Sequence, residues 1–170
     1  MNRVGLFEKV SFNTFFRDLK ELTNIEDEEK AKDIYKRISL PQRATKGSAG
    51  YDFFMPFWIE LNPNESVIIP TGIRCYMLED WVLSLFPRSG LGFKYRMQLD
   101  NTCGIIDSDY YYSSNEGHIM VKITNDTRDN KILTLDCNDR FVQAIFHPFG
   151  ITFNDEINNI RNGGFGSTGA

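Results

Sequence analysis

The chain has 170 residues, of which 41% are hydrophobic and 25% are charged, a balance typical of one folded domain with a sizeable core. Its 19 basic and 23 acidic residues give a formal net charge of −4, which excludes a broad positive field for duplex nucleic acid or an anionic membrane. Its apolar runs are too short to span a bilayer, and the N-terminus has no apolar signal segment. We therefore expect a cytoplasmic protein, with Cys75, Cys103 and Cys137 as reduced, mostly buried thiols.

The N-terminal segment is predicted to be helical from residue 7 to about residue 37. Apolar residues recur at helical spacing in its first half: Phe12, Phe15, Phe16, Leu19 and Leu22. Thr23 followed by Glu26 resembles a capping box that begins a second helix. We expect residues 1–37 to form a two-helix extension, whose phenylalanines pack on the main domain or on a neighbouring subunit.

Short β-rich runs follow from about Ile38, separated by Gly, Pro, Asn and Asp. The candidate strands are 51–57, 66–69, 73–77, 81–86, 97–99, 118–124, 132–135 and 141–146. Strands at this spacing favour a sandwich or a jelly-roll barrel, so residues 38–154 are predicted to form an all-β jelly-roll-like barrel.

The remaining residues, 155–170, are predicted to be a flexible, glycine-rich flap. Glycine allows backbone N–H groups to approach an anion closely, Arg161 supplies a planar cation, and Phe165 offers a face for stacking on a base. Many tails of this composition are simply disordered ends. An aromatic residue between glycines, with a cation four positions earlier, instead favours a lid over a nucleotide polyphosphate.

Four further clusters interrupt the β pattern with polar residues. Their ranges are 49–52, 87–92, 101–110 and 140–143. The first carries Asp52, the second is a glycine-rich turn with Arg88 that suits phosphate, and the third resembles a tight hairpin with an amide on one arm and an acid and a phenol on the other. Each cluster alone has an ordinary explanation, such as a turn cap or a surface ion pair.

Taken in chain order, these clusters and the tail resemble the five motifs of the trimeric dUTPase (dUTP nucleotidohydrolase) family. The resemblance covers about residues 40–170, and its most specific parts are PRSGLG at 87–92, GIIDSDY at 104–110 and GGFGSTG at 163–169. It implies a jelly-roll subunit and a homotrimer whose sites gather residues from three subunits. It also implies hydrolysis of dUTP to dUMP and pyrophosphate with Mg²⁺ on the triphosphate.

The resemblance implies a role for each residue of the central motifs. Asp107 would orient and deprotonate the attacking water, with Arg140 and Gln143 as its catalytic partners. Asn101 would pair with uracil, and Tyr110 would pack under the deoxyribose and exclude a 2′-hydroxyl. The backbone that joins them would complete the base site at Gly104 and Ile106.

The same resemblance places the phosphates and the metal. Arg88, Ser89 and Gly90 would cradle the phosphates, a task that Gln143 shares. Mg²⁺ would be held chiefly by phosphate oxygens and water, with Asp52 acting through water.

In the tail, the resemblance assigns the stacking on uracil to Phe165 and the contact with the terminal phosphate to Arg161. The residues that would close on the triphosphate are Gly166, Ser167 and Thr168. Closure of such a lid would exclude all water except the nucleophile.

The chain departs from the family pattern in two places. Residues 111–116 are inserted before Gly117, beside the expected sugar pocket, and Arg161 lies one residue closer to the Gly-Gly pair. Two alternatives stay open. One is an enzyme like the dCTP deaminases, which requires a glutamate as a proton shuttle beside the nucleobase. The other is a dUTP-loaded trimer that recruits a protein through the N-terminal helices or the 111–116 loop.

Overall fold

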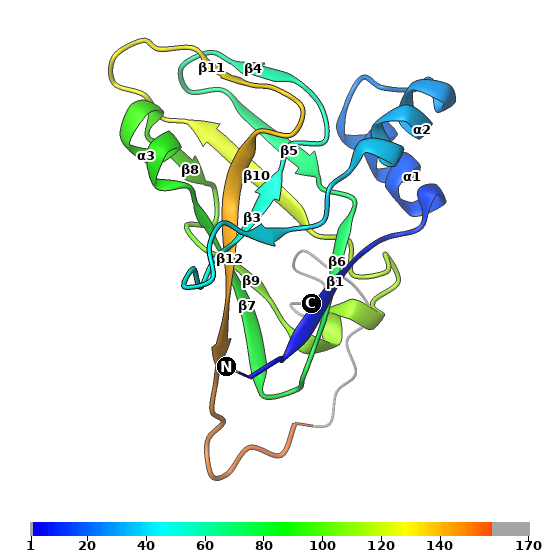
Figure 1. Ribbon diagram of the computed structural model, residues 1–170, viewed down its shortest axis with the longest axis vertical. Coiled ribbons are helices and arrows are strands. Elements are labelled where there is room, and N and C mark those ends of the chain that lie inside the picture. The colour runs from blue at the N-terminus through cyan, green and yellow to red at the C-terminus, as the bar shows by residue number, and fades with distance from the viewer. Residues whose placement is uncertain (1, 158–170) are drawn as a thin grey trace.

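The computed structural model describes residues 2–157 as a mostly β protein with three α-helices (Figure 1). The helices are α1 (Phe12–Leu22), α2 (Glu28–Arg37) and α3 (Ser89–Tyr95), with a 3₁₀ helix η1 (Ser108–Tyr112). The strands are β1 (Gly5–Lys9), β2 (Gln42–Arg43), β3 (Tyr51–Phe54), β4 (Ile59–Leu61), β5 (Ser66–Pro70), β6 (Ile73–Met77), β7 (Trp81–Pro87), β8 (Met97–Leu99), β9 (Gly104–Ile106), β10 (Met120–Asn125), β11 (Leu133–Leu135) and β12 (Arg140–Pro148).

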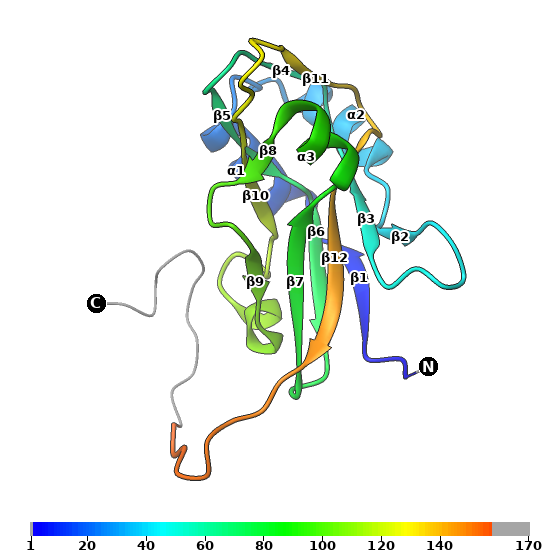
Figure 2. The same ribbon diagram turned by 90° about the vertical axis from the view of Figure 1, so that its left-hand side faces the viewer.

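The strands of residues 2–157 form four antiparallel sheets. The largest has the order β2-β3-β12-β7-β9, another has the order β5-β10-β8, and β1-β6 and β11-β4 are two-stranded. The long strands β7 and β12 lie side by side through the middle of the molecule (Figure 2). The predicted barrel does not close within this part of the chain, because consecutive strands such as β8 and β9 pair with different sheets and leave free edges.

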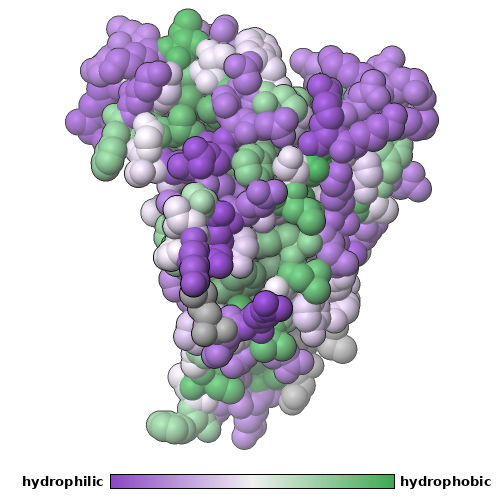
Figure 3. Space-filling view, in the orientation of Figure 1, coloured by the Kyte–Doolittle hydropathy of each residue, from purple (hydrophilic) through white to green (hydrophobic). Residues whose placement is uncertain are grey.

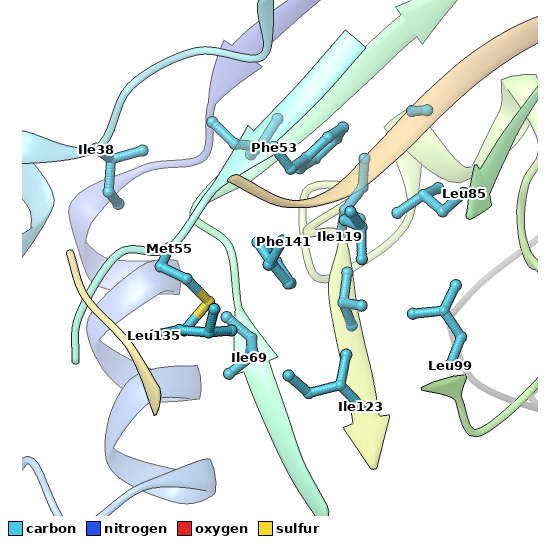
Figure 4. Close-up of a cluster of buried hydrophobic side chains, with 14 of the residues drawn as sticks. Ile38, Phe53, Met55, Ile69, Leu85, Leu99, Ile119, Ile123, Leu135 and Phe141 are labelled. Carbon is cyan, nitrogen blue, oxygen red and sulfur yellow. The ribbon is translucent and has the colours of Figure 1, made fainter. Parts of the chain in front are cut away.

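One apolar core joins the sheets and the N-terminal helices (Figure 4). Phe53, Ile69 and Phe141 are almost completely buried, as are Phe15 and Leu19 of α1. The phenylalanine stripe of the first helix therefore packs on the main body of the protein, the first of its two expected locations. The outward surface near α2 is largely hydrophilic (Figure 3).

Two boundaries predicted for the N-terminal segment are wrong. Residues 7–9 are not helical, because Gly5–Lys9 forms β1 and pairs with β6 in the main body. Thr23 does not begin α2; its Oγ1 donates a hydrogen bond to Leu19 O (2.7 Å) and helps to end α1. Asp27 caps α2 instead, accepting a hydrogen bond from Lys30 N (2.7 Å).

The β-strand predictions are accurate for 73–77 and 97–99, which match β6 and β8. β3 ends at Phe54 rather than at residue 57, whereas β12 extends beyond the predicted range at both ends. Short β2, β4 and β9 were not predicted. The segment 87–92 was predicted to be a turn, but only its first two residues lie outside a helix. α3 begins at Ser89 although the segment contains two glycines.

The described part of the chain contains no helix that is both long and apolar enough to cross a membrane. Cys75, Cys103 and Cys137 are free thiols, as expected. Cys75 is buried, and burial raises the pKa of its thiol to about 12, so it packs as a small apolar side chain. The other two are only partly buried.

A buried hydrogen-bond chain fastens α1 to the segment before β10. His118 Nε2 accepts a hydrogen bond from Gly72 N (2.8 Å), which leaves the proton on Nδ1 to donate to Asp18 Oδ2 (2.6 Å). Arg17 Nε donates to the other oxygen of Asp18 (2.8 Å). Burial raises the pKa of Asp18, but the hydrogen bonds from His118 and Arg17 outweigh burial and lower it below its usual value.

The inserted segment 111–116 docks on the N-terminal elements. Glu116 Oε2 accepts a hydrogen bond from Ser11 N (2.8 Å), and its Oε1 accepts from Ser11 Oγ and Thr14 Oγ1 (2.5 Å each). These bonds satisfy donors at the first turn of α1. Tyr111 donates to Glu8 of β1 (2.5 Å). The insertion, which begins with the last two residues of η1, therefore connects η1 to β1 and α1.

Replacing Asp18 with asparagine should lower the free energy of unfolding by about 1–3 kcal/mol, because a buried charge-assisted hydrogen bond is lost. The native carboxylate has a lowered pKa, so its stabilisation is present above the unfolded-state pKa and is lost as the pH falls through the folded-state pKa. Urea unfolding between pH 3 and pH 7 measures both effects. Asp33→Asn, at an exposed position, is the control; equal behaviour of the two variants would contradict the assignment.

Candidate active site

Four of the polar residues singled out in the sequence lie on one face of the largest sheet. Gln143 of β12 pairs with Asp52 of β3 on one side and with Phe86 of β7 on the other. Cross-strand partners share a face, and side chains two residues apart on a strand do so as well. Arg88, two residues beyond Phe86, therefore returns to the face that carries Asp52 and Gln143.

A β-bulge brings Arg140 to the same face. On a regular strand, Arg140 and Gln143 would point to opposite faces because they are three residues apart. The register of β12 against β3 shifts between Arg140 and Val142, so Arg140 pairs with Phe54, which shares a face with Asp52. The extra residue thus reverses the alternation. The bulge creates a cluster of Arg140, Gln143 and Asp52 that strand periodicity alone does not predict.

The cluster carries an excess of positive charge. Asp52 Oδ2 lies 2.8 Å from Arg88 Nη1 and 3.4 Å from Arg140 Nη1, and its side chain is only 9% exposed. Two guanidinium groups share one carboxylate, so one positive charge stays uncompensated within this group. Because Arg140 is about half exposed, the arrangement suits an anion with several oxygens, such as a polyphosphate.

Exposed Ser89 and Gly90 lie beside this cluster, where α3 begins. A Cβ atom at Gly90 would have no protein atom within 4 Å. Packing inside the chain therefore does not explain the glycine.

Gly50 places the Gln143 side chain. A Cβ atom at Gly50 would lie 2.6 Å from Gln143 Oε1 and 3.5 Å from Gln143 Cβ. The absence of a side chain at Gly50 thus permits the observed position of Gln143 beside Asp52. Gly47 in the same loop has open space around it.

A separate cavity of about 690 Å³ contains all four residues expected to contact the base and sugar. Those residues are Asn101, Gly104, Ile106 and Tyr110. Apolar side chains make up much of the remaining wall: Leu22, Ile68, Leu85, Leu99, Ile105, Met120 and Val121. A cavity with mostly apolar walls and an amide at its edge suits a neutral, planar ring.

The cavity exists because the expected tight hairpin does not form. β8 pairs with β10 and β9 pairs with β7, so these neighbouring strands diverge on either side of the 100–103 turn. Both are the last strands of their sheets. Each therefore has an edge with backbone N–H and C=O groups outside the sheet ladders. Such groups can pair with the edge of a base.

Tyr110 is held in place at the cavity by its hydroxyl group. The hydroxyl donates to His118 O (2.8 Å) and accepts from Asn115 Nδ2 (2.8 Å). Only 5% of the residue is exposed. With its polar end bound to the 113–118 segment, the ring is left as a fixed apolar surface.

Asp107 does not line the 690 Å³ cavity, although it directly follows Ile106. It lines a second hollow of about 850 Å³ together with Asp109, Glu79 and Asp80. Within residues 2–157, no three acidic, histidine or cysteine side chains form a cluster that could hold a metal ion.

Two cavity residues at the end of α1 were not predicted from the sequence. Glu21 and Leu22 line the base cavity, although they are far from the motifs along the chain. Helical periodicity predicted that Leu22 faces inward, but it could not place that face against β5. The five tail residues assigned to a lid, 161 and 165–168, lie outside the described residues.

The fold and the two sites define a mostly β protein with a largely apolar cavity and a separate cationic cluster. The sequence profile of the dUTPase family matches residues 36–169. A deoxyuridine 5′-triphosphate nucleotidohydrolase from Lactococcus lactis is 39% identical over 136 residues, covering 78% of this chain and 89% of the relative. The chain belongs to the dUTPase family.

Solved structures show the same fold. The dUTPase from Streptococcus mutans matches with a TM-score of 0.64 and 33% identity, over 86% of this chain and 97% of that one. A mutant form of the dUTPase from phage phi11 of S. aureus, described with a structural Mg(II) ion, matches with a TM-score of 0.63. At 17% identity over 92% of this chain and 98% of that one, the second likeness is one of fold alone.

Gly50→Ala should lower the rate of dUTP hydrolysis by roughly tenfold to a hundredfold, because a displaced Gln143 disturbs the geometry of the cluster. Pyrophosphate release measures the rate, and thermal unfolding checks that the fold is intact. Gly47→Ala is the matched control, since its new methyl group meets no atom. An unimpaired Gly50→Ala enzyme would show that the position of Gln143 has no part in the reaction.

Proposed function

We propose that this protein hydrolyses dUTP to dUMP and pyrophosphate, with uracil in the cavity of Asn101 and Tyr110 and the phosphates on the cluster of Arg88. The observation that carries the proposal is the division of the site into an apolar cavity with free backbone edges and a separate arginine pair. A nucleoside triphosphate has the same division into a neutral ring and a polyanion. Family membership supplies the reaction.

Recognition of uracil is supported by the divergence of β8 and β9. Uracil presents alternating acceptors and a donor along one edge, which free backbone groups and the Asn101 amide can match. By resemblance to the family, the base site would also exclude the methyl group of thymine. The fixed ring of Tyr110 would leave a 2′-hydroxyl without a partner, which favours the deoxy sugar.

The phosphate end is assigned to Arg88, Ser89 and Gly90 with Arg140 and Gln143. Guanidinium groups match phosphate oxygens in a bidentate manner, and Asp52 keeps both arginines oriented by its short contacts. With its carboxylate engaged in this way, Asp52 acts mainly by positioning the arginines. Charge that develops on the bridging oxygen in the transition state would fall near these donors.

Asp107 is assigned the role of general base. It would accept a proton from a water molecule whose oxygen forms the new bond to the α-phosphorus. The bond between that phosphorus and the oxygen bridging to the β-phosphate breaks, and pyrophosphate leaves. Mg²⁺, held by phosphate oxygens and water, would neutralise charge on the triphosphate. The acidic hollow around Asp107 tolerates a cation there.

A homotrimer is proposed from the family resemblance, and the sharing of sites between its subunits is supported by a distance. Asp107 follows Ile106, which pairs with Leu83, so it lies level with about Val82 at one end of β7. Arg88 lies six residues further along, which is roughly 20 Å at about 3.3 Å per residue. One triphosphate cannot contact both groups of one chain, so we infer that Asp107 and Arg88 of different subunits meet at each site.

The tail completes the proposal as a lid, with Phe165 over the base and Arg161 at the terminal phosphate. The jelly-roll-like subunit is proposed on the same family basis, and the division into 1–37, 38–154 and 155–170 stays a proposal from the sequence pattern. The free thiols fit a reducing compartment such as the cytoplasm.

A nucleotide panel tests the function. With Mg²⁺ present, pyrophosphate release should be fast from dUTP and at least a hundredfold slower from UTP, dTTP and dCTP, because a different base or a 2′-hydroxyl would leave polar groups without partners. Ammonia release from dCTP is measured in parallel and should be absent. Comparable rates for all four nucleotides would refute the claim that the cavity selects dUTP. Ammonia release would support a deaminase instead.

Asp107→Asn should lower kcat by roughly 10²–10⁴-fold and leave the affinity for a non-hydrolysable dUTP analogue nearly unchanged, because only proton transfer is lost. Asp109→Asn, which changes a second carboxylate of the same hollow, is the matched control. A near-normal rate for Asp107→Asn would remove Asp107 from this role.

Mixed subunits test the shared site. Asp107→Asn and Arg88→Ala chains are each expected to be inactive alone. When the two are co-expressed in equal amounts and assemble at random, about one quarter of sites receive an intact Asp107 from one chain and an intact Arg88 from another. Recovery of about a quarter of the wild-type activity is the expected result. No recovery would place both residues of a site in one chain.

A further inference from the structure

We propose that the end of α1 forms a wall of the nucleotide pocket, with Leu22 packing against the neutral end of the nucleotide and Glu21 turning the phosphates away. This inference rests on the proposed function, because it takes the 690 Å³ cavity as the base and sugar site. It assigns substrate contacts to a segment that precedes the family match, which begins at residue 36.

Leu22 reaches the cavity through the packing of α1. Phe15 and Leu19 of the same helix are completely buried, and α1 packs on β5, whose Ile68 lines the cavity directly opposite Lys122 of β10. Leu22 is only partly buried. An apolar side chain that is left partly uncovered at a cavity wall gains contact area when a ring fills the cavity.

The charges around the cavity favour entry of the neutral end. Its charged lining residues are Glu21, Asp100 and Lys122. Lys122 Nζ lies 2.7 Å from Asp100 Oδ2, so the single cation of this lining is already paired and Glu21 leaves the wall with a net negative charge. A triphosphate placed there would meet repulsion, whereas an uncharged base would not. Glu21 thus helps to orient the nucleotide.

The wall is fixed before the ligand binds. Asp18, one turn before Leu22, is hydrogen-bonded to His118, and Glu116 caps the start of α1 at Ser11. Both partners belong to the segment that also holds the hydroxyl of Tyr110. The two sides of the cavity, Leu22 and Tyr110, are therefore held at a set separation, which reduces the entropy lost on binding.

Two inhibitors that resemble the halves of the nucleotide test the wall in the full-length enzyme. Leu22→Ala should raise the KM for dUTP and the inhibition constant of deoxyuridine by roughly tenfold, the effect of a lost apolar pocket contact. The inhibition constant of pyrophosphate should change less than about twofold, because pyrophosphate lacks the neutral end of the nucleotide. The kcat should also change less than about twofold, because the lost contact stabilises the bound substrate and the transition state equally. Ile25→Ala is the control, since Ile25 is also apolar and partly buried against the core but does not line the cavity.

Glu21→Gln tests the charge. Pyrophosphate should inhibit this variant several-fold more strongly than wild type at low ionic strength, and the difference should vanish at high salt because the effect is electrostatic. Deoxyuridine inhibition should not change. Glu26→Gln, which alters an exposed glutamate away from the cavity, is the matched control.

The outcomes separate the inference from the proposed function. If the wild-type enzyme releases no pyrophosphate from dUTP, the proposed function fails. If the wild-type enzyme is active but Leu22→Ala matches Ile25→Ala in deoxyuridine inhibition, the wall is refuted and the function stands. An equal loss of deoxyuridine and pyrophosphate inhibition in Leu22→Ala would point to general destabilisation and would also overturn the inference.

Discussion

The arrangement of both sites depends on the central position of β12, which pairs with β3 on one side and β7 on the other. This double pairing sets Gln143 level with Asp52 and Phe86, so residues from three distant stretches of the chain reach one face. A one-residue slip would send each of these side chains to the opposite face. The bulge after Arg140 is a local exception to that register, and it adds the second arginine. Strand register therefore brings the cationic cluster together, and Gly50 in the loop before β3 leaves room for Gln143.

The second consequence of the sheet order is the separation of β8 from β9. Four residues join them, yet each pairs with a different sheet, and the space between them is the base cavity. A closed hairpin would have satisfied the same backbone groups internally and left nothing for a ligand to bind. Two edges that would be a liability on an exposed surface lie here beside a cavity, where under the proposed function a base takes the place of the missing strand.

The comparison of sequence and structure shows which features a linear pattern contains. Strands with alternating burial, such as Ile73–Met77, are visible in the sequence because period-two patterning reports directly on a half-buried sheet. The motif residues were also found from the sequence, since glycine beside charge or amide is uncommon in a core. The helix indicated by Phe12, Phe15 and Phe16 was extended too far towards the N-terminus. The ring of Phe7 instead packs with Tyr51 and Phe53 after β1 pairs with β6.

Other features lie beyond a local pattern for a physical reason. The bulge at Arg140 depends on the partner strand, and the divergence of β8 and β9 depends on which sheets β7 and β10 belong to. Leu22 shows the same limit. Its periodicity indicates a buried face, but whether that face meets the core or a ligand cavity is decided by contacts between elements far apart in the chain.

The N-terminal helices and the 111–116 insertion are best understood as one feature. Glu116 is partly buried against the start of α1 and has Ser11 and Thr14 as its donors; burial raises the pKa of its carboxyl, and these hydrogen bonds lower it to a net value below normal. Without α1, that carboxylate would lose its partners, and without the insertion, the first turn of α1 would lose its acceptor. His118 and Asp18 have the same mutual dependence. Asn115 of the insertion also holds the hydroxyl of Tyr110, so a change in either region affects the position of Tyr110 at the cavity. The two regions therefore depend on each other.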